Sequence, residues 1–271
     1  MPTMGDAEAI KARQRHTWGL GDYSVLSRQL APAAVELSDA CAVSAGQEVL
    51  DVAAGDGNFA LACAREGASV VASDFAPRMV ELGRARTQAE GYDVEWVEAD
   101  AEALPFEDAR FDCAGSAFGA FLAPQPDVMA SELFRVVRPG NTVGLTAWLA
   151  DGVFIKLFGL ARRLFPPPPG VGLPEEWGDE DTVRARLDGL AAHVECERRT
   201  LAWTGASPEA LEAELADSAP SYAAAREALD AERFEELRGE TLELVRSLNT
   251  ADDGTASIDA DYLVIVARKR G

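Results

Sequence analysis

The stretch that decides the fold is VLDVAAGDGNFA, at residues 49–60. A short apolar run that favours a β-strand leads into a turn with two glycines, and an Ala-rich helical pattern follows at 59–66. Gly55 and Gly57 let a ligand approach the backbone closely, and the first N–H groups of the next helix are free to bind it. With Ala60 they match G-x-G-x-x-A, a dinucleotide-binding spacing that is weakly specific by itself.

The alternation of strand and helix continues on both sides of this turn. Apolar and β-branched runs predict strands at 48–52, 69–73, 94–98, 111–116, 142–148, 194–203 and 262–269. Helical patterns lie between the early strands, at 59–66, 77–90 and 128–137. Because alternating strands and helices are typical of a parallel sheet covered on both faces, we expect an α/β fold.

Three helical segments have no strand partners in this pattern, namely residues 1–40, 151–190 and 205–250. We expect them to lie over one end of the sheet as a lid. Since they are interleaved with the strands, we expect a single domain, whose core comprises 41–149 and 192–271.

The charge of the chain excludes some partners. It has 25 basic and 46 acidic residues, a net charge of −21. Such a surface repels phosphate backbones and anionic membranes, so we expect neither a nucleic-acid nor a membrane partner. The sequence has no membrane-length apolar run and no secretory signal pattern, which predicts a cytoplasmic protein. Four scattered cysteines and two histidines, without a C-x-x-C pair, predict no metal site.

Acidic residues recur where predicted strands end. Asp51 lies at the glycine turn, Asp74 ends the second strand, and Asp100 follows the third. Because ligands bind at the carboxyl ends of parallel strands, we expect these three residues to converge. Asp51 and Asp56 disfavour a pyrophosphate and favour a cationic ammonium. Local roles remain open, since Asp74 can cap a helix and Asp100 can form a turn.

Together these segments resemble the class I S-adenosylmethionine-dependent methyltransferases, in the branch of ubiquinone/menaquinone-type and other bacterial small-molecule enzymes. The resemblance rests on VLDVAAGDGNFA (49–60), VVASDFAPRMVELGRAR (70–86), VEADAEALPFEDARFDCAGSAFGAFLAPQPD (97–127) and ELFRVVRPGNTVGLTAW (132–148). It implies a Rossmann-like seven-stranded sheet with an antiparallel last strand near one edge. It also implies methyl transfer to a small organic molecule, with secondary metabolites and quinone-like phenols as candidates.

The resemblance further implies which residues contact S-adenosylmethionine. The glycine loop holds the methionine part, Asp74 holds the ribose, and Asp100 with Ala101 contacts the adenine. The complete predicted set is Trp18, Tyr23, Asp51, Ala53, Gly55, Gly57, Asn58, Asp74, Phe75, Met79, Asp100, Ala101, Glu102, Ser116 and Phe118.

The segment RQRHTWGLGDYSVLS, at 13–27, resembles the N-terminal cap of this branch. Trp18 and Tyr23 are predicted to close over the cofactor, although both can instead pack the cap onto the sheet. No catalytic base is assigned; His16 is a candidate, but a lone histidine on a helix is more often structural. Five aromatic residues can wall an apolar acceptor pocket or belong to the core, namely Phe118, Phe121, Phe154, Phe158 and Trp177.

Two other functions remain open at this point. A nicotinamide-dependent oxidoreductase could use Gly55, Gly57 and Ala60, although the neighbouring acidic residues count against it. A cofactor-binding protein without catalysis is the second alternative. The sequence indicates neither the acceptor atom nor an oligomeric state.

Overall fold

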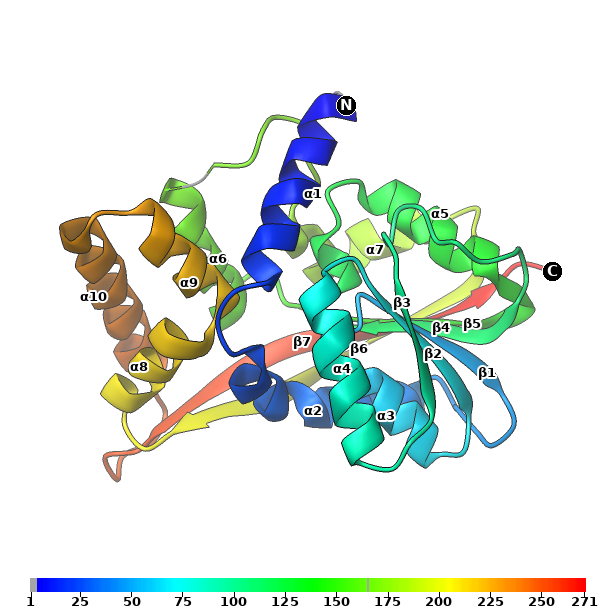
Figure 1. Cartoon of the computed structure of the whole chain (residues 1–271), viewed down its shortest axis with the longest axis horizontal. Coiled ribbons are helices and arrows are strands. Elements are labelled where there is room, and N and C mark those ends of the chain that lie inside the picture. Colours follow the sequence, from blue (N-terminus) through cyan, green and yellow to red (C-terminus); the bar gives the residue numbers. More distant parts are fainter. Residues whose placement is uncertain (1–3, 165) are drawn as a thin grey trace.

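The computed structural model describes residues 4–164 and 166–271, through which one sheet runs (Figure 1). Its seven strands lie in the order β3-β2-β1-β4-β5-β7-β6. Their bounds are β1 (Glu48–Val52), β2 (Ser69–Asp74), β3 (Val94–Glu98), β4 (Phe111–Ala117), β5 (Val137–Trp148), β6 (Ala191–Gly205) and β7 (Ala256–Lys269). All seven strands predicted from the sequence are confirmed, and β5, β6 and β7 are longer than predicted.

The first five strands are parallel, and β7 lies antiparallel between β5 and β6. This confirms the Rossmann-like sheet with one antiparallel strand near its edge. β1 is covered on both faces, so Val49, Leu50 and Val52 are all buried, and Asp51 is the one charged residue among them. The strand order reverses between β1 and β4, which opens a crevice at their carboxyl ends.

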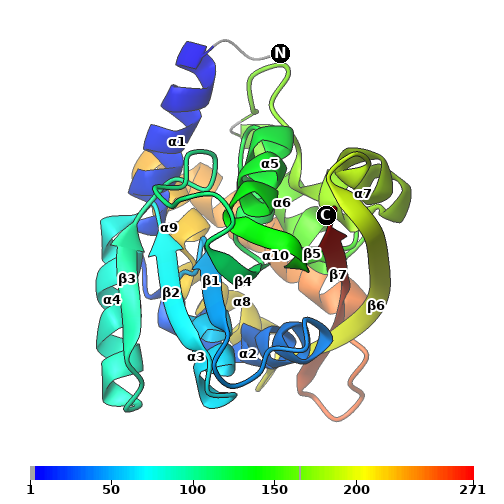
Figure 2. The ribbon, with the colours of Figure 1, turned by 90° about the vertical axis from the view of Figure 1, so that its right-hand side faces the viewer.

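The helices occupy both faces of the sheet and one end of it. Their bounds are α1 (Met4–Trp18), α2 (Tyr23–Ala40), α3 (Asn58–Arg65), α4 (Pro77–Ala89), α5 (Pro126–Val136), α6 (Val153–Leu164), α7 (Glu180–Leu187), α8 (Pro208–Ser218), α9 (Pro220–Ala228) and α10 (Ala231–Leu248), with short 3-10 turns η1 (Ala120–Leu122) and η2 (Pro174–Gly178). Figure 2 shows α2 and α3 on one side of the sheet and α5 and α7 on the other.

The structure differs from the predicted lid in two places. α2 packs on α3 and on the strands from β4 to β7, and so belongs to the layer that covers the sheet. Leu30, Ala33, Ala34 and Leu37 form its buried stripe at helical spacing, and the small alanines let the helix approach the strands closely. α7 likewise packs beside α5 and β6.

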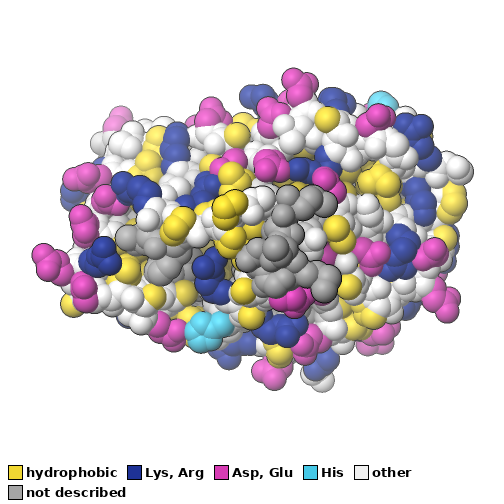
Figure 3. All heavy atoms as spheres, turned by 90° about the horizontal axis from the view of Figure 1, so that it is seen from above, with side chains coloured by type: hydrophobic (Ala, Val, Ile, Leu, Met, Phe, Trp, Pro, Cys, Tyr) yellow, Lys and Arg dark blue, Asp and Glu magenta, His cyan; other side chains and the backbone are white. Residues whose placement is uncertain are grey.

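The remaining helices form a separate group, the helical lobe, made of α6, α8, α9 and α10. These four gather at one end of the molecule (Figure 1), and α9 contacts α1. Acidic and basic side chains are interspersed on the face shown in Figure 3. None of the helices in the described residues is long and apolar enough to cross a membrane.

Candidate functional site

A pocket lies at the carboxyl ends of the first four strands, with about 900 Å³ of empty space that includes open solvent at its mouth. We call it the first cavity. The segments that follow β1 to β4 supply one side of it, and α1 with Tyr23 closes the other. Its walls include Lys11, Gln14, Trp18, Tyr23, Asp51, Ala53, Gly55, Asn58, Asp74, Phe75, Asp100, Ala101 and Phe118. Eleven of the fifteen cofactor contacts predicted from the sequence therefore lie around one space, which is the convergence that a parallel sheet imposes.

The glycine turn wraps one end of the first cavity in a backbone conformation that favours glycine. Gly55 has a φ of 57° and Gly57 a φ of 94°. The Gly55 N–H donates to Oδ2 of Asp74 at 2.9 Å, which fixes the turn against β2. A Cβ on Gly57 would lie 2.9 Å from the ring of Trp96, so Gly57 is required by packing outside the cavity wall.

Two residues without glycine's freedom also adopt left-handed backbone conformations at this edge. Ala53, after β1, has a φ of 51°, and Phe118, after β4, has a φ of 55°. A Cβ on Gly119 would lie 2.1 Å from the carbonyl oxygen of Ala53, so these two segments touch. The Phe118 N–H donates to Oγ1 of Thr146 at 3.0 Å and helps to hold this geometry. Backbone strain of this kind clusters at ligand-binding sites.

Asp74 ends β2 with its carboxylate in the wall of the first cavity. It accepts hydrogen bonds from the N–H groups of Gly55 and Ala76, both at 2.9 Å. Burial raises the pKa of Asp74 to about 6, although these backbone donors counteract the shift. Each carboxylate oxygen can accept a further hydrogen bond. Asp74 can therefore cap the local backbone and accept a hydrogen bond from a ligand at the same time.

Asp51 lies deeper in the same wall and is 1% exposed. Its Oδ2 accepts from the N–H of Ala60 at 2.8 Å, while Oδ1 is buried with no hydrogen-bond partner. Burial raises the pKa of Asp51 well above its ordinary value. An unpaired buried carboxylate oxygen is costly, so the site favours a cationic donor beside Asp51.

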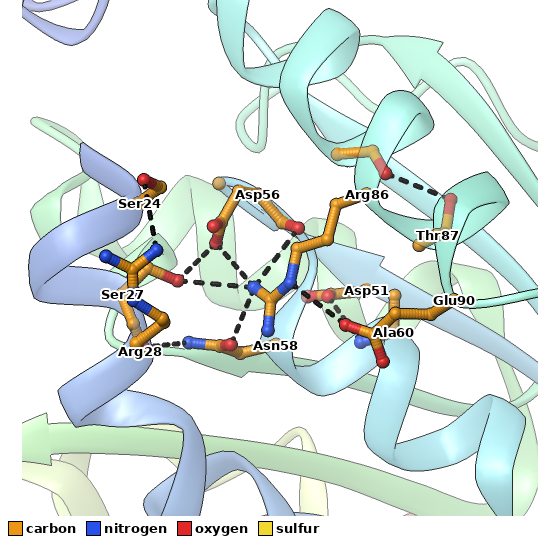
Figure 4. A network of polar contacts seen from close by, with 12 residues as sticks. Ser24, Ser27, Arg28, Asp51, Asp56, Asn58, Ala60, Arg86, Thr87 and Glu90 are labelled. Atoms are coloured by element: carbon orange, nitrogen blue, oxygen red, sulfur yellow. Dashed lines mark hydrogen bonds and ion pairs between the residues drawn. The ribbon is translucent and has the colours of Figure 1, made fainter. Parts of the chain in front are cut away.

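Asp56, by contrast, is neutralised within the protein (Figure 4). Its Oδ1 lies 3.1 Å from Nη1 of Arg86 and accepts from the hydroxyl of Ser27. Nη1 of Arg86 also donates to Oδ1 of Asn58 at 2.9 Å, and Asn58 donates to the carbonyl of Ser27 at 2.8 Å. The sequence argument that Asp56 repels a phosphate is therefore corrected, because this network pairs its charge and ties α2 to α4.

The far end of the first cavity carries a second carboxylate pair with a cation from α1. Nζ of Lys11 lies 2.7 Å from Oδ2 of Asp100 and 2.6 Å from Oε2 of Glu102. Burial lowers the pKa of the Lys11 ammonium, but the hydrogen bonds and charges of both carboxylates outweigh burial and leave it raised. Lys11 was not among the site residues predicted from the sequence. The signal was its spacing, since Lys11, Gln14 and Trp18 fall on one helical face.

Trp18 and Tyr23 meet edge to face, with ring centroids 5.2 Å apart. A Cβ on Gly55 would lie only 3.1 Å from Cε1 of Tyr23, so this ring lies directly over the glycine turn. Burial and the neighbouring aspartates raise the pKa of Tyr23. The phenol therefore stays protonated and can donate a hydrogen bond.

Five predicted residues lie outside the wall of the first cavity, and each has another partner. Gly57 packs under Trp96, and Met79 is buried in the core at 1% exposure. Oγ of Ser116 accepts from the N–H of Ala120 at 2.8 Å. Glu102 accepts from the backbone and side-chain nitrogens of Gln125, at 2.6 and 2.8 Å. His16 is exposed, with Nε2 2.8 Å from Glu227, so the structure does not place it as a base.

A second cavity adjoins the first, with about 780 Å³ of empty space that includes open solvent. The two share walls formed by Gln14, Trp18, Tyr23, Leu30, Phe118 and Leu122. Trp148 stacks between Phe118, at 3.8 Å, and Phe154, at 4.2 Å between ring centroids. Four of the five aromatic residues predicted for an acceptor pocket line it; Trp177 does not. Trp177 is buried instead, with the Arg186 guanidinium 4.8 Å from its ring.

Comparison with known proteins identifies the family of this chain. Residues 49–140 match the methyltransferase domain family. The Mycobacterium tuberculosis protein Rv1405c is 37% identical over 187 residues, which are 68% of this chain and 68% of that protein. The demethylmenaquinone methyltransferase of Clavibacter sepedonicus is 42% identical over 109 residues, which are 40% of this chain and 44% of that enzyme.

Among solved structures, the fold is shared with phosphoethanolamine N-methyltransferase 2 of Haemonchus contortus in complex with phosphomonomethylethanolamine and S-adenosylhomocysteine. That similarity covers 89% of this chain and 53% of the other, with a TM-score of 0.59 and 17% identity. The matched family segment contains the glycine turn, Asp74 and Asp100. This chain belongs to the class I S-adenosylmethionine-dependent methyltransferases, in the branch that includes the demethylmenaquinone methyltransferases.

Proposed function

We propose that the first cavity binds S-adenosylmethionine and that the second holds a flat, apolar small molecule that accepts the methyl group. The observation that carries this proposal is the convergence of Asp51, Asp74 and Asp100 in one wall. The shared boundary of the two cavities supports it, because methyl transfer requires the donor and the acceptor to meet in line.

The residues of the first cavity fit the three parts of the cofactor. The unpaired Oδ1 of Asp51 suits the ammonium of the methionine part. Asp74 can accept from the ribose hydroxyls, and Asp100, beside Phe75 and Ala101, can accept from the adenine amino group. The Haemonchus structure was solved with S-adenosylhomocysteine bound, which agrees with this assignment.

The second cavity favours an uncharged aromatic acceptor. Its described lining contains no Asp, Glu, Lys, Arg or His side chain. A phosphate or carboxylate group would be buried there without a cation, which is strongly unfavourable. The stacked rings of Phe118, Trp148 and Phe154 can pack against the face of an aromatic acceptor. A quinone-like phenol fits these walls, in line with the demethylmenaquinone methyltransferase relatives.

The mechanism needs positioning more than proton transfer by the protein. When bound, S-adenosylmethionine supplies a methyl group that its sulfonium already activates. The chain contributes orientation through the carboxylates, and it excludes water by means of Trp18, Tyr23 and α1. Tyr23 is the one titratable side chain among the described lining of the second cavity, and its raised pKa makes it a donor. The described lining of the second cavity therefore offers no general base to an acceptor that must lose a proton.

Calorimetric titration tests the cofactor assignment. We expect S-adenosylhomocysteine to bind and NAD not to bind, because a pyrophosphate at the glycine turn would face Asp51. Asp51→Asn should weaken S-adenosylhomocysteine binding by about tenfold or more, since the amide keeps the shape but loses the charge that attracts the ammonium. Binding of NAD with no binding of S-adenosylhomocysteine would instead support the oxidoreductase alternative. S-Adenosylhomocysteine binding without methyl transfer to any acceptor tested would support the non-catalytic alternative.

A charge placed in the second cavity tests the acceptor class. Phe158 lines the second cavity but not the first. We expect Phe158→Glu to lower kcat/KM for a neutral aromatic acceptor by about tenfold or more, because the new carboxylate brings water into an apolar wall. Phe158→Leu is the matched control and should have a much smaller effect. Affinity for S-adenosylhomocysteine should stay unchanged in both variants. Preferred turnover of phosphate-bearing or amino-acid acceptors by the native enzyme would contradict this acceptor class.

A further inference from the structure

α1 forms a wall of both cavities. Lys11, Gln14 and Trp18 line the first cavity, and Gln14, Thr17 and Trp18 line the second. Gln14 lies three residues after Lys11 and three and four residues before Thr17 and Trp18, so these side chains lie on one side of the helix. Any movement of α1 therefore changes the cofactor site and the acceptor site together. Figure 1 shows α1 between the helical lobe and the part of the molecule that contains β1 to β4.

Several polar contacts hold α1, beside the packing of Trp18 on Tyr23. Nε2 of Gln14 donates to the carbonyl of Leu122 at 3.0 Å, and Nε of Arg15 donates to the carbonyl of Phe75 at 2.9 Å. Ile10 is the buried apolar side chain among the described residues of this helix. Elements with little buried apolar area open at low free-energy cost. The position of α1 therefore depends on individual polar contacts.

Lys11 makes the most enclosed of these contacts. Its side chain is 13% exposed, and those of Glu102 and Asp100 are 2% and 30% exposed. Without the ammonium, the two carboxylates would lie close together with like charges, which is unfavourable. Oδ1 of Asp100 also accepts from the N–H of Glu102 at 2.9 Å. Each Asp100 oxygen thus has one partner and can still accept another hydrogen bond.

We propose that Lys11 is a positioning residue for the cofactor, because its ammonium fastens α1 to the carboxylates at the adenine end and so makes cofactor binding and closure of the second cavity a single event. This inference rests on the proposed function. When Lys11 is lost, Asp100 and Glu102 repel each other and the adenine end loses its shape. Gln14, Thr17 and Trp18 then leave the walls of the second cavity with the helix.

Isothermal titration of the full chain with S-adenosylhomocysteine tests the role of Lys11. Lys11→Met should weaken binding by about tenfold to a hundredfold, the effect of removing a hydrogen bond between charged groups. Lys11→Arg keeps the charge and should remain within about threefold of the native protein. Arg13→Met is the matched control, because Arg13 is an exposed cation on the same helix that lines neither cavity, and it should bind as the native protein does.

A smaller ligand locates the effect at the adenine end. 5′-Methylthioadenosine carries the adenine and the ribose but no amino-acid part. Lys11→Met should weaken this ligand by the same factor as S-adenosylhomocysteine. Asp51→Asn should weaken S-adenosylhomocysteine alone, because 5′-methylthioadenosine has no ammonium for Asp51 to bind. A Lys11→Met loss seen only with S-adenosylhomocysteine would place Lys11 at the wrong end of the cavity and overturn the proposal.

Hydrogen exchange shows whether Lys11 couples the helix to the cofactor. In the native protein, S-adenosylhomocysteine should slow exchange in residues 12–27, while β1 changes little because it is already protected. In Lys11→Met, saturating ligand should leave exchange in α1 fast. Native-like affinity and native-like slowing in Lys11→Met would overturn the proposal and leave the proposed function standing. If the native protein bound no S-adenosylhomocysteine, the proposed function and this inference would both be refuted.

Discussion

Replacing Gly55 with valine is expected to abolish the binding of S-adenosylhomocysteine, with a loss of at least about a hundredfold. Gly55 has a φ of 57°, and a Cβ there would lie 3.1 Å from Cε1 of Tyr23. A β-branched side chain is strongly disfavoured at this φ, so the turn must rearrange. The rearrangement would move the Gly55 N–H, which donates a hydrogen bond to Asp74, and it would displace Tyr23 from the glycine turn. Calorimetric titration measures the loss.

The matched control for this variant is Gly91→Val. Gly91 has a φ of 83°, and a Cβ there would have no atom within 4 Å. It therefore carries the same kind of backbone strain far from the first cavity. We expect a lowered Tm in both variants but normal affinity for S-adenosylhomocysteine in Gly91→Val. Normal affinity in Gly55→Val as well would mean that the glycine turn does not contact the ligand.

Asp74→Ala is expected to weaken S-adenosylhomocysteine binding by about 1.5–3 kcal/mol, the range for hydrogen bonds to a charged group. The alanine removes the acceptor for the ribose and the acceptor for the N–H groups of Gly55 and Ala76. Asp74→Asn separates these effects, because it keeps one acceptor oxygen of the same shape and should lose less. If folded Asp74→Ala bound with native affinity, Asp74 would act only as a helix cap.

The raised pKa of Asp74 gives this site a pH dependence. The ionised carboxylate is the acceptor, and ribose donors stabilise that form, so the affinity is full above the pKa and falls with protonation. Since burial puts the pKa at about 6, S-adenosylhomocysteine binding should weaken as the pH falls through about 6. Asp51 titrates beside it with a pKa that burial also raises. Asp74→Asn should therefore remove part of the pH dependence, and Asp51→Asn the rest.

The strands and the glycine turn could be predicted because their signals are local. A strand that is covered on both faces needs a mostly apolar sequence, and β1 has one apart from Glu48 and Asp51. The turn at Gly55 follows from a strand that must pass directly into a helix. The left-handed conformations of Ala53 and Phe118 carried no such signal, because neither residue type favours them.

The positions of the helical segments could not be predicted from the sequence. They depend on tertiary packing, which the alternation of strands and helices does not specify. The buried stripe of α2 marks an amphipathic helix but not its partner. α2 covers the sheet beside α3, and its Ala33 and Ala34 are fully buried there. Residues 1–40 thus divide into α1 over the first cavity and α2 against the sheet.

The sequence by itself determined the α/β fold and the carboxylates at the ends of the strands, because parallel strands bring their carboxyl ends to one edge. Only the tertiary structure decided which charges remain available to a ligand. Arg86 neutralises Asp56, whereas Asp51 keeps an unpaired oxygen. It also brought Lys11 to Asp100 and built the second cavity from aromatic residues on separate elements. The reason is physical: burial and charge pairing depend on neighbours far apart in the chain, which no local pattern records.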